Sequence, residues 1–114
     1  MVNFACKKVS KEEIIRCSFG LNKSAYNLLC FLLKQKKPLD INSISRNMNL
    51  ERSSIQKAIP FLIEKDLITR SQKNISSGGY LYFYATKDKE EIKKRIKELV
   101  TLWYENIKRE IEKI

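Results

Sequence analysis

The chain has 114 residues, of which 43% are hydrophobic and 32% charged, and this is enough apolar content for one folded domain. Lysine and arginine total 23 against 13 acidic residues, so the formal net charge is +10, and there is no histidine. The lack of histidine excludes histidine-based catalysis and, with only three scattered cysteines, argues against a zinc site or a disulfide framework. We therefore expect a non-enzymatic protein with no metal and no cofactor, in a reducing cytoplasmic setting.

The positive charge is unevenly distributed. Residues 1–86 carry 14 basic and 6 acidic side chains, whereas residues 87–114 carry 9 and 7. A concentrated positive field favours a polyanion, either nucleic acid or an anionic membrane surface. No apolar run is long enough for a membrane span, the N-terminus lacks a signal-peptide apolar segment, and the charges of the C-terminal segment are balanced. We therefore expect nucleic acid as the partner and no membrane.

The first 20 residues predict an arm and a short helix. Residues 1–9 are expected to form a short strand or arm. Ser10 and Glu13 have the spacing of a capping box, which opens a helix that Gly20 stops.

A central core helix is predicted over residues 23–36. Asn22 can cap it, and Pro38 ends it. Its apolar stripe is wide enough for a buried helix. Cys17 and Cys30 stand among apolar residues and are expected to be small core residues.

A pair of helices is expected next. Asn42 is predicted to cap a brief helix over residues 43–48, and a second helix follows over residues 51–65. In the second helix the spacing of Ile55, Ile59 and Leu62 predicts the buried edge. Pro60 removes a backbone hydrogen bond inside this helix and is expected to kink or loosen it.

Two strands and a turn follow the helix pair. Residues 67–73 alternate, residues 74–79 are rich in turn formers, and residues 80–85 are rich in aromatic strand formers, so a hairpin is predicted. The tyrosines of the second strand fall on one face: Tyr80, Tyr82 and Tyr84. They could stack single-stranded bases, but we favour cross-strand packing and cover for the end of the last helix.

The last helix is predicted from a cap at Thr86 or Asp88 to the C-terminus. Its apolar side is too long to be buried against a small domain, so we expect pairing with a second copy in an antiparallel or crossed dimer. An intramolecular cover is the alternative. The expected dimerisation residues are Ile96, Leu99, Val100, Trp103, Ile107 and Ile111.

The order of elements predicts a mainly α fold with a small β-hairpin, namely a winged helix-turn-helix domain plus a long C-terminal helix. Ile44 to Arg70 resembles the DNA-binding segment of archaeal and bacterial MarR/TrmB-like winged-helix regulators, and the resemblance covers about residues 21–86. Those families enter the wing with "G-L-I/V-x-R", where this chain has Asp66-Leu67-Ile68-Thr69-Arg70. The predicted division is residues 1–20 as arm and short helix, 21–86 as DNA-binding domain and 87–114 as dimerisation helix.

The second helix of the pair has polar side chains on its open side, and these suit DNA. Arginine and glutamine can read purine edges in a bidentate manner, while serine and lysine can reach phosphates or bases. The candidate contacts on this helix are Arg52, Ser53, Ser54, Gln56 and Lys57, and those in the hairpin are Arg70, Lys73, Asn74, Ser76 and Ser77.

These features predict a homodimeric, sequence-specific transcriptional regulator that binds double-stranded DNA. The recognition helix would enter the major groove, and the wing would lie on the backbone or in the minor groove. Two alternatives stay open, an architectural DNA binder and a winged helix used only for protein–protein assembly. No phosphate-binding loop and no small-molecule effector site is evident in the sequence.

Overall fold

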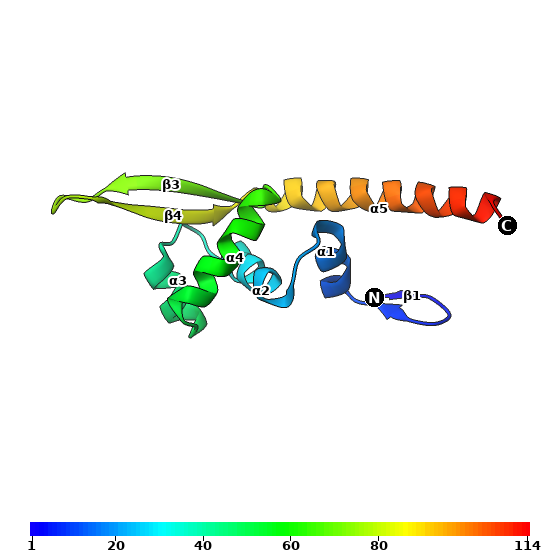
Figure 1. Cartoon of the computed structure of the whole chain (residues 1–114), viewed down its shortest axis with the longest axis horizontal. Coiled ribbons are helices and arrows are strands. Elements are labelled where there is room, and N and C mark those ends of the chain that lie inside the picture. Colours follow the sequence, from blue (N-terminus) through cyan, green and yellow to red (C-terminus); the bar gives the residue numbers. More distant parts are fainter.

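The computed structural model describes residues 1–114 as five helices and two antiparallel hairpins. In chain order they are β1 (Val2–Asn3), β2 (Lys8–Val9), α1 (Lys11–Phe19), α2 (Lys23–Leu33), α3 (Ile41–Met48), α4 (Arg52–Glu64), β3 (Ile68–Asn74), β4 (Tyr80–Thr86) and α5 (Lys89–Glu112). The β3–β4 hairpin and α5 leave the helical core in opposite directions, so the molecule measures 66 × 23 × 22 Å (Figure 1). The predicted fold class is confirmed. None of the helices has the length and apolar content to cross a membrane.

The hydrophobic core lies around α2, which contributes Ala25, Leu28, Leu29 and Leu32. This spacing places all four on one face of the helix. The remaining core residues come from every other helix and from the β3–β4 hairpin: Phe19, Leu21, Ile44, Ile55, Ala58, Ile59, Leu62, Leu67, Ile68, Tyr84 and Ile92. No charged side chain is buried.

Cys17 was expected in the core, and this expectation is wrong, because its side chain is exposed. Helix α1 packs through Phe19 and through Ile15, which lies four residues earlier on the same face. Cys17 falls between them in sequence and therefore points away from the core. Cys30 is half-buried.

The predicted caps hold at three helices. The Ser10 side chain accepts a hydrogen bond from the Glu13 amide at the start of α1, and Asn22 accepts one from the Ala25 amide at the start of α2. Gly20 ends α1 with φ +66°, a left-handed conformation that favours glycine. Asp88, one of the two candidates, caps α5 by accepting from the Glu91 amide.

The predicted start of α3 is wrong. The cap residue is Asp40 rather than Asn42, and the helix begins at Ile41. The Ser43 hydroxyl donates a hydrogen bond of 2.5 Å to the Asp40 carboxylate, and this bond holds the pKa of Asp40 below its ordinary value. The carboxylate is therefore oriented by a side chain of the first helical turn.

Helix α2 ends at Leu33, three residues before the predicted end. The segment that follows must return to the hairpin, where Leu39 and Tyr84 exchange two backbone hydrogen bonds of 2.8 and 3.0 Å. Helix α4, in contrast, continues through Pro60. Pro60 and Gln56 are both exposed, so the backbone carbonyl that loses its partner lies on the solvent side.

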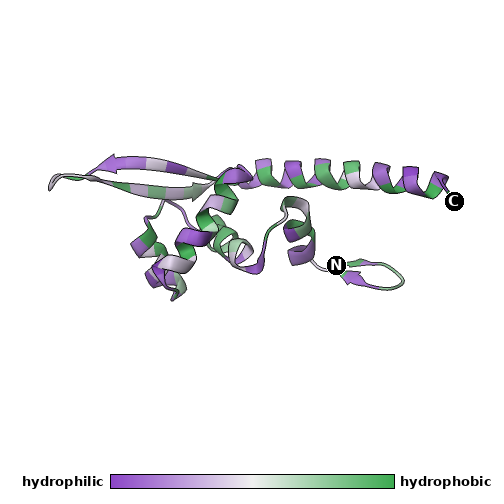
Figure 2. Cartoon of the chain, in the orientation of Figure 1, coloured by the Kyte–Doolittle hydropathy of each residue, from purple (hydrophilic) through white to green (hydrophobic).

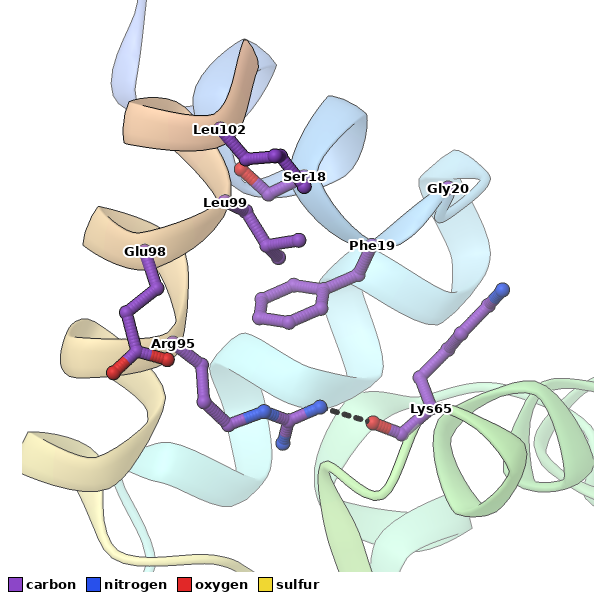
Figure 3. A pocket seen from close by; sticks show the side chains of 8 residues that line it. All are labelled: Ser18, Phe19, Gly20, Lys65, Arg95, Glu98, Leu99 and Leu102. Carbon is purple, nitrogen blue, oxygen red and sulfur yellow. Dashed lines mark hydrogen bonds between the residues drawn. The ribbon is translucent and has the colours of Figure 1, made fainter. Parts of the chain in front are cut away.

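The end of α4 is tied to α5 by one arginine. Arg95 donates a hydrogen bond of 2.6 Å to the Lys65 carbonyl (Figure 3) and one of 2.7 Å to the Asp66 carbonyl. Its guanidinium carbon lies 5.2 Å from the centre of the Phe19 ring in α1. Asp66 has φ +56° at the position where the resembling families have glycine, and its carboxylate lies 3.3 Å from the Lys87 ammonium. We call Arg95 and these two carbonyls the Arg95 clamp.

An open hollow of about 550 Å³ lies beside the Arg95 clamp. Figure 3 shows Phe19 of α1 and Leu99 and Leu102 of α5 on its apolar side. Residues of α1 and α5 both line the hollow, and Arg95 at its edge supplies the two hydrogen bonds that join α5 to the end of α4.

We predict that Arg95→Ala lowers the free energy of unfolding by about 1–3 kcal/mol, because two hydrogen bonds to a charged donor and the contact with Phe19 are lost. Urea unfolding followed by circular dichroism measures the change. The matched control is Arg109→Ala, since Arg109 is exposed on α5 and bonds only to Asn106. The control should change stability by about 0.5 kcal/mol or less. Equal stability of the two variants would contradict a structural role for the clamp.

Candidate nucleic-acid interface

Helices α3 and α4 are joined by a tight turn. Asn49 ends α3 with φ +55°, and the Leu50 amide donates to the Ser45 carbonyl at 3.1 Å. The Ser45 hydroxyl also donates to the Leu50 carbonyl. Ile44 and Ile55 are almost fully buried between the two helices. These contacts fix α4 against α3 and leave the opposite side of α4 open to solvent.

The open side of α4 contains the five residues that the sequence singles out. The buried side consists of Ile55, Ala58, Ile59 and Leu62, as the spacing predicts. The following residues are all exposed, and none of their side chains makes a hydrogen bond or ion pair within the chain: Arg52, Ser53, Ser54, Gln56 and Lys57. Their donors are therefore available to an external ligand.

The N-terminus of α4 is also free of a side-chain cap. Glu51 occupies the cap position, and its side chain accepts no hydrogen bond from the first turn, whereas its backbone carbonyl accepts from the Ser54 and Ile55 amides. The first amides of a helix have no partner within it, and they carry the positive end of the helix dipole. This end of α4 is suited to a phosphate that lies beside Arg52.

The two faces of the hairpin differ in their surroundings. Arg70 pairs with Tyr84 in the ladder, and Asn74 pairs with Tyr80, so all four side chains share one face. The inner end of this face lies against the core, because Tyr84 is buried. Lys73 pairs with Leu81 on the other face. The predicted wing residues are therefore divided between two faces, and the structure does not bring Arg70 and Lys73 together.

An arginine and two tyrosines stack along the core-side face of the hairpin. The Arg70 guanidinium carbon lies 4.3 Å from the centre of the Tyr82 ring, and the Tyr80 and Tyr82 ring centres are 5.1 Å apart at an angle of 62°. The Tyr82 hydroxyl, through a side-chain hydrogen bond, raises the pKa of Tyr80. We call Arg70, Tyr80 and Tyr82 the wing stack.

The tyrosines, which were expected to pack across the strands and cover the end of the last helix, differ in burial: Tyr84 lies in the core, whereas Tyr80 does not. Tyr84 is 4% exposed, whereas Tyr80 is 52% exposed. Helix α5 leaves from the opposite end of the hairpin, so it cannot cover Tyr80 (Figure 1). The strand extends beyond the core, and only its inner end is covered.

The tip of the hairpin is a polar turn. The Gly78 amide donates to the Ile75 carbonyl, and the Ile75 amide donates to the Gly79 carbonyl. Both glycines have positive φ, +97° and +81°. The predicted contacts Asn74, Ser76 and Ser77 are all exposed in or beside this turn.

A groove joins the open side of α4 to the hairpin. It has a volume of about 680 Å³, and its wall includes Gln56, Pro60, Arg70 and Tyr84. Gln56 and Arg70, which are 14 positions apart in the sequence, therefore line one surface. Glu64 is the only carboxylate in this lining.

The charges around the groove favour an anionic ligand. Residues 67–87 contain no acidic residue but include Arg70, Lys73 and Lys87. Figure 2 shows the hydrophilic colour running along much of β3. Sequence reasoning missed Arg46, which is exposed at the end of α3 beside the turn into α4. Its position near a helix C-terminus is the only sequence signal that could have indicated it.

Three packed helices followed by a β-hairpin form the winged helix-turn-helix arrangement, and this chain is a winged-helix protein. Residues 18–83 match the family described as RuvB C-terminal winged helix domain, and the chain belongs to that family. The predicted resemblance to winged-helix regulators is thereby confirmed at the level of the winged-helix class.

Two archaeal relatives match most of the chain. The uncharacterized protein MJ1503 of Methanocaldococcus jannaschii is 34% identical over 109 residues, which are 96% of this chain and 82% of the relative. The uncharacterized protein MJ1082 of the same organism is 30% identical over 103 residues, with coverage of 90% and 84%. The chain is therefore similar to these proteins over nearly their whole length.

Solved structures share the fold. A possible transcriptional regulator from Methanosarcina mazei Go1 has a TM-score of 0.88 and 31% identity, covering 99% of this chain and 95% of that one. The ST1889 protein from Sulfolobus tokodaii has a TM-score of 0.69 and 17% identity, with coverage of 85% and 94%. At that identity the second comparison supports the fold alone.

Proposed function

We propose that the protein is a homodimeric, sequence-specific transcriptional regulator that binds double-stranded DNA. One observation carries the proposal: the open side of α4 presents polar side chains without intramolecular partners, and a groove joins it to a hairpin without acidic residues. The similar Methanosarcina mazei structure, described as a possible transcriptional regulator, supports the same function.

Helix α4 is the proposed recognition helix. It has 13 residues and is therefore about 20 Å long, and the major groove of B-DNA is about 12 Å wide. Arg52 and Gln56 are one turn apart on the open side and would read purine edges. Ser53, Ser54 and Lys57 would contact phosphates or bases beside them.

The hairpin is the proposed wing. Arg70 faces the groove beside α4 and would contact the backbone that borders the major groove. Lys73 is on the other face and would reach a phosphate only at the edge of the hairpin. Asn74, Ser76 and Ser77 at the tip would donate to the backbone or enter the minor groove.

Helix α5 is proposed to form the dimer. From Leu99 to the C-terminus every residue is exposed except Ile107, which is half-buried. Large apolar side chains are among them, with Trp103 54% and Ile111 55% exposed. The apolar side comprises Ile96, Leu99, Val100, Trp103, Ile107 and Ile111. Since α5 extends away from its own core (Figure 1), a second copy in an antiparallel or crossed arrangement is the proposed cover.

The proposal assigns residues 1–20 to an arm, 21–86 to DNA binding and 87–114 to dimerisation. The protein would act in the cytoplasm without catalysis, metal or cofactor. An architectural DNA binder and a protein–protein assembly module are the outcomes that the experiments below distinguish from a regulator.

Selection of bound duplexes from a random library is expected to return two half-sites about 34 Å apart. Arg52→Ala combined with Gln56→Ala should reduce the preference for the selected site, by about 1–3 kcal/mol per lost bidentate contact. Lys73→Ala should weaken all duplexes alike and reduce the slope of log affinity against log salt by about 1. Fluorescence anisotropy at several salt concentrations measures both effects.

Lys11→Ala is the matched control for the lysine variant. Lys11 is exposed on α1 and has no ion pair, so the same charge is removed far from the proposed interface. If the library returns no motif although duplexes bind, the protein is an architectural binder. If neither the helix variant nor the wing variant alters duplex affinity, the assembly module is favoured instead.

Sedimentation equilibrium is expected to show a dimer that dissociates on dilution. Trp103→Glu should give a monomer, because a charge on the buried apolar side of the dimer would be desolvated without a partner. The fold should survive, since Trp103 is exposed in the single chain. Thr101→Glu adds the same charge on the other side of α5 and should leave the dimer intact. A wild-type mass that stays monomeric at every concentration would reject the dimer.

A further inference from the structure

Most of the hairpin receives no support from the rest of the chain. The residues from Arg70 to Leu81 are all exposed, and they include Ile75 at 40% and Tyr80 at 52%. Ile75 and Tyr80 flank the polar turn and are available for contact with a ligand. A dimer formed through α5 does not cover the tip, because α5 extends in the opposite direction (Figure 1). The side chains at the outer end of the hairpin therefore stay accessible in such a dimer.

The wing stack gives Tyr80 a defined orientation. Tyr84, Tyr82 and Tyr80 follow one another on one face at steps of about 7 Å, and their burial decreases from buried through half-buried to exposed. Arg70 lies over the ring of Tyr82, and Tyr82 contacts Tyr80 edge to face. Tyr80 is thereby held in place with much of its ring accessible, so a stacking ligand would lose little additional entropy on binding.

The charges identify the chemistry of the ligand. The two strands of the hairpin carry Arg70 and Lys73, neither of them in an ion pair, and no carboxylate. A ligand that satisfies this surface is flat, apolar on its faces and linked to negative charge, which describes a nucleobase with its phosphate. In a closed duplex the faces of internal bases are covered by their neighbours, whereas an unpaired base offers its face to an aromatic side chain.

We propose that Tyr80, held by the wing stack, binds the face of an unpaired nucleobase. The protein therefore prefers DNA in which a duplex adjoins unpaired bases over the same duplex fully paired. This inference rests on the proposed function, because α4 must hold the paired segment while the wing reaches the unpaired one. Arg70 lines the groove together with Gln56 and shares one face of the hairpin with Tyr80, so the two contacts follow one another along that side of the molecule.

The test uses the full chain and three DNA probes of the same sequence: a closed duplex, a duplex with a three-nucleotide bulge, and the single strand. The bulge contains 2-aminopurine, whose fluorescence reports stacking. We expect tighter binding to the bulged duplex than to the closed one and quenching of the bulged base. Tyr80→Ala should abolish the quenching and weaken binding to the bulged duplex by about 5-fold to 100-fold, with little effect on the closed duplex. Tyr80→Phe should retain both properties, because it keeps the ring.

Phe4→Ala is the matched control. Phe4 is also an exposed aromatic in the turn of a two-stranded hairpin with lysines nearby, and it is 56% exposed. The Phe4→Ala variant should bind all three probes with the affinity of the wild type. Equal affinity of the wild type and Tyr80→Ala for the bulged duplex would overturn the inference, while Arg52-dependent binding to the closed duplex would leave the proposed function standing. A lack of binding to every probe would overturn both.

Discussion

The arrangement of the whole molecule depends on the junction at Lys65 and Asp66, where α4 ends. The left-handed backbone at Asp66 turns the chain into β3, and the Arg95 clamp fixes α5 at the same point. Three elements are therefore joined at this one junction: the proposed recognition helix, the proposed wing and the proposed dimer helix. In a dimer joined through α5, the distance between the two recognition helices would follow from the geometry of this junction. A substitution of Arg95 would therefore alter DNA binding although Arg95 is not one of the proposed DNA contacts.

Some elements carry charged side chains that form ion pairs, and others carry basic side chains without a partner. Ion pairs occur along α1, with Glu12 bound by Arg16 and Lys23, and along α5, with i,i+3 pairs such as Lys93 with Glu90. The basic residues of α4 and of the β3–β4 hairpin have no such partner within the chain. Exposed ion pairs contribute little to stability, but they neutralise the field around them. Arg52, Lys57, Arg70 and Lys73 therefore place positive charge on α4 and on the hairpin that no ion pair neutralises, and such charge attracts a polyanion.

Local signals predicted most of the fold, and longer-range contacts decided the rest. Caps such as Ser10 and Asn22 act within three residues, so the sequence is sufficient to place those helices. At α3, Asp40 and Asn42 are both suitable caps, and the choice depends on where Leu39 meets Tyr84 in space. Arg95 looks like any solvated lysine or arginine of α5, because its partners are 29 and 30 residues away. The open side of α4 could be predicted from periodicity, whereas the groove that adds Arg70 to Gln56 depends on packing.

The hairpin illustrates how one sequence pattern serves two purposes. Tyr80 and Tyr84 have identical side chains and share one face of the hairpin, and their positions along the strand make one a surface residue and the other a core residue, because only the inner end of β4 is covered. The ladder register places them opposite Asn74 and Arg70. The turn from Ile75 to Gly79 sets that register, because it fixes which residue of β3 lies opposite each tyrosine. A slip of β4 by one position, with β3 held in place, would turn Tyr84 from the core to the solvent side. The burial of Tyr84 therefore stabilises the register that also stacks Arg70 on Tyr82, so the core determines the geometry of the exposed wing.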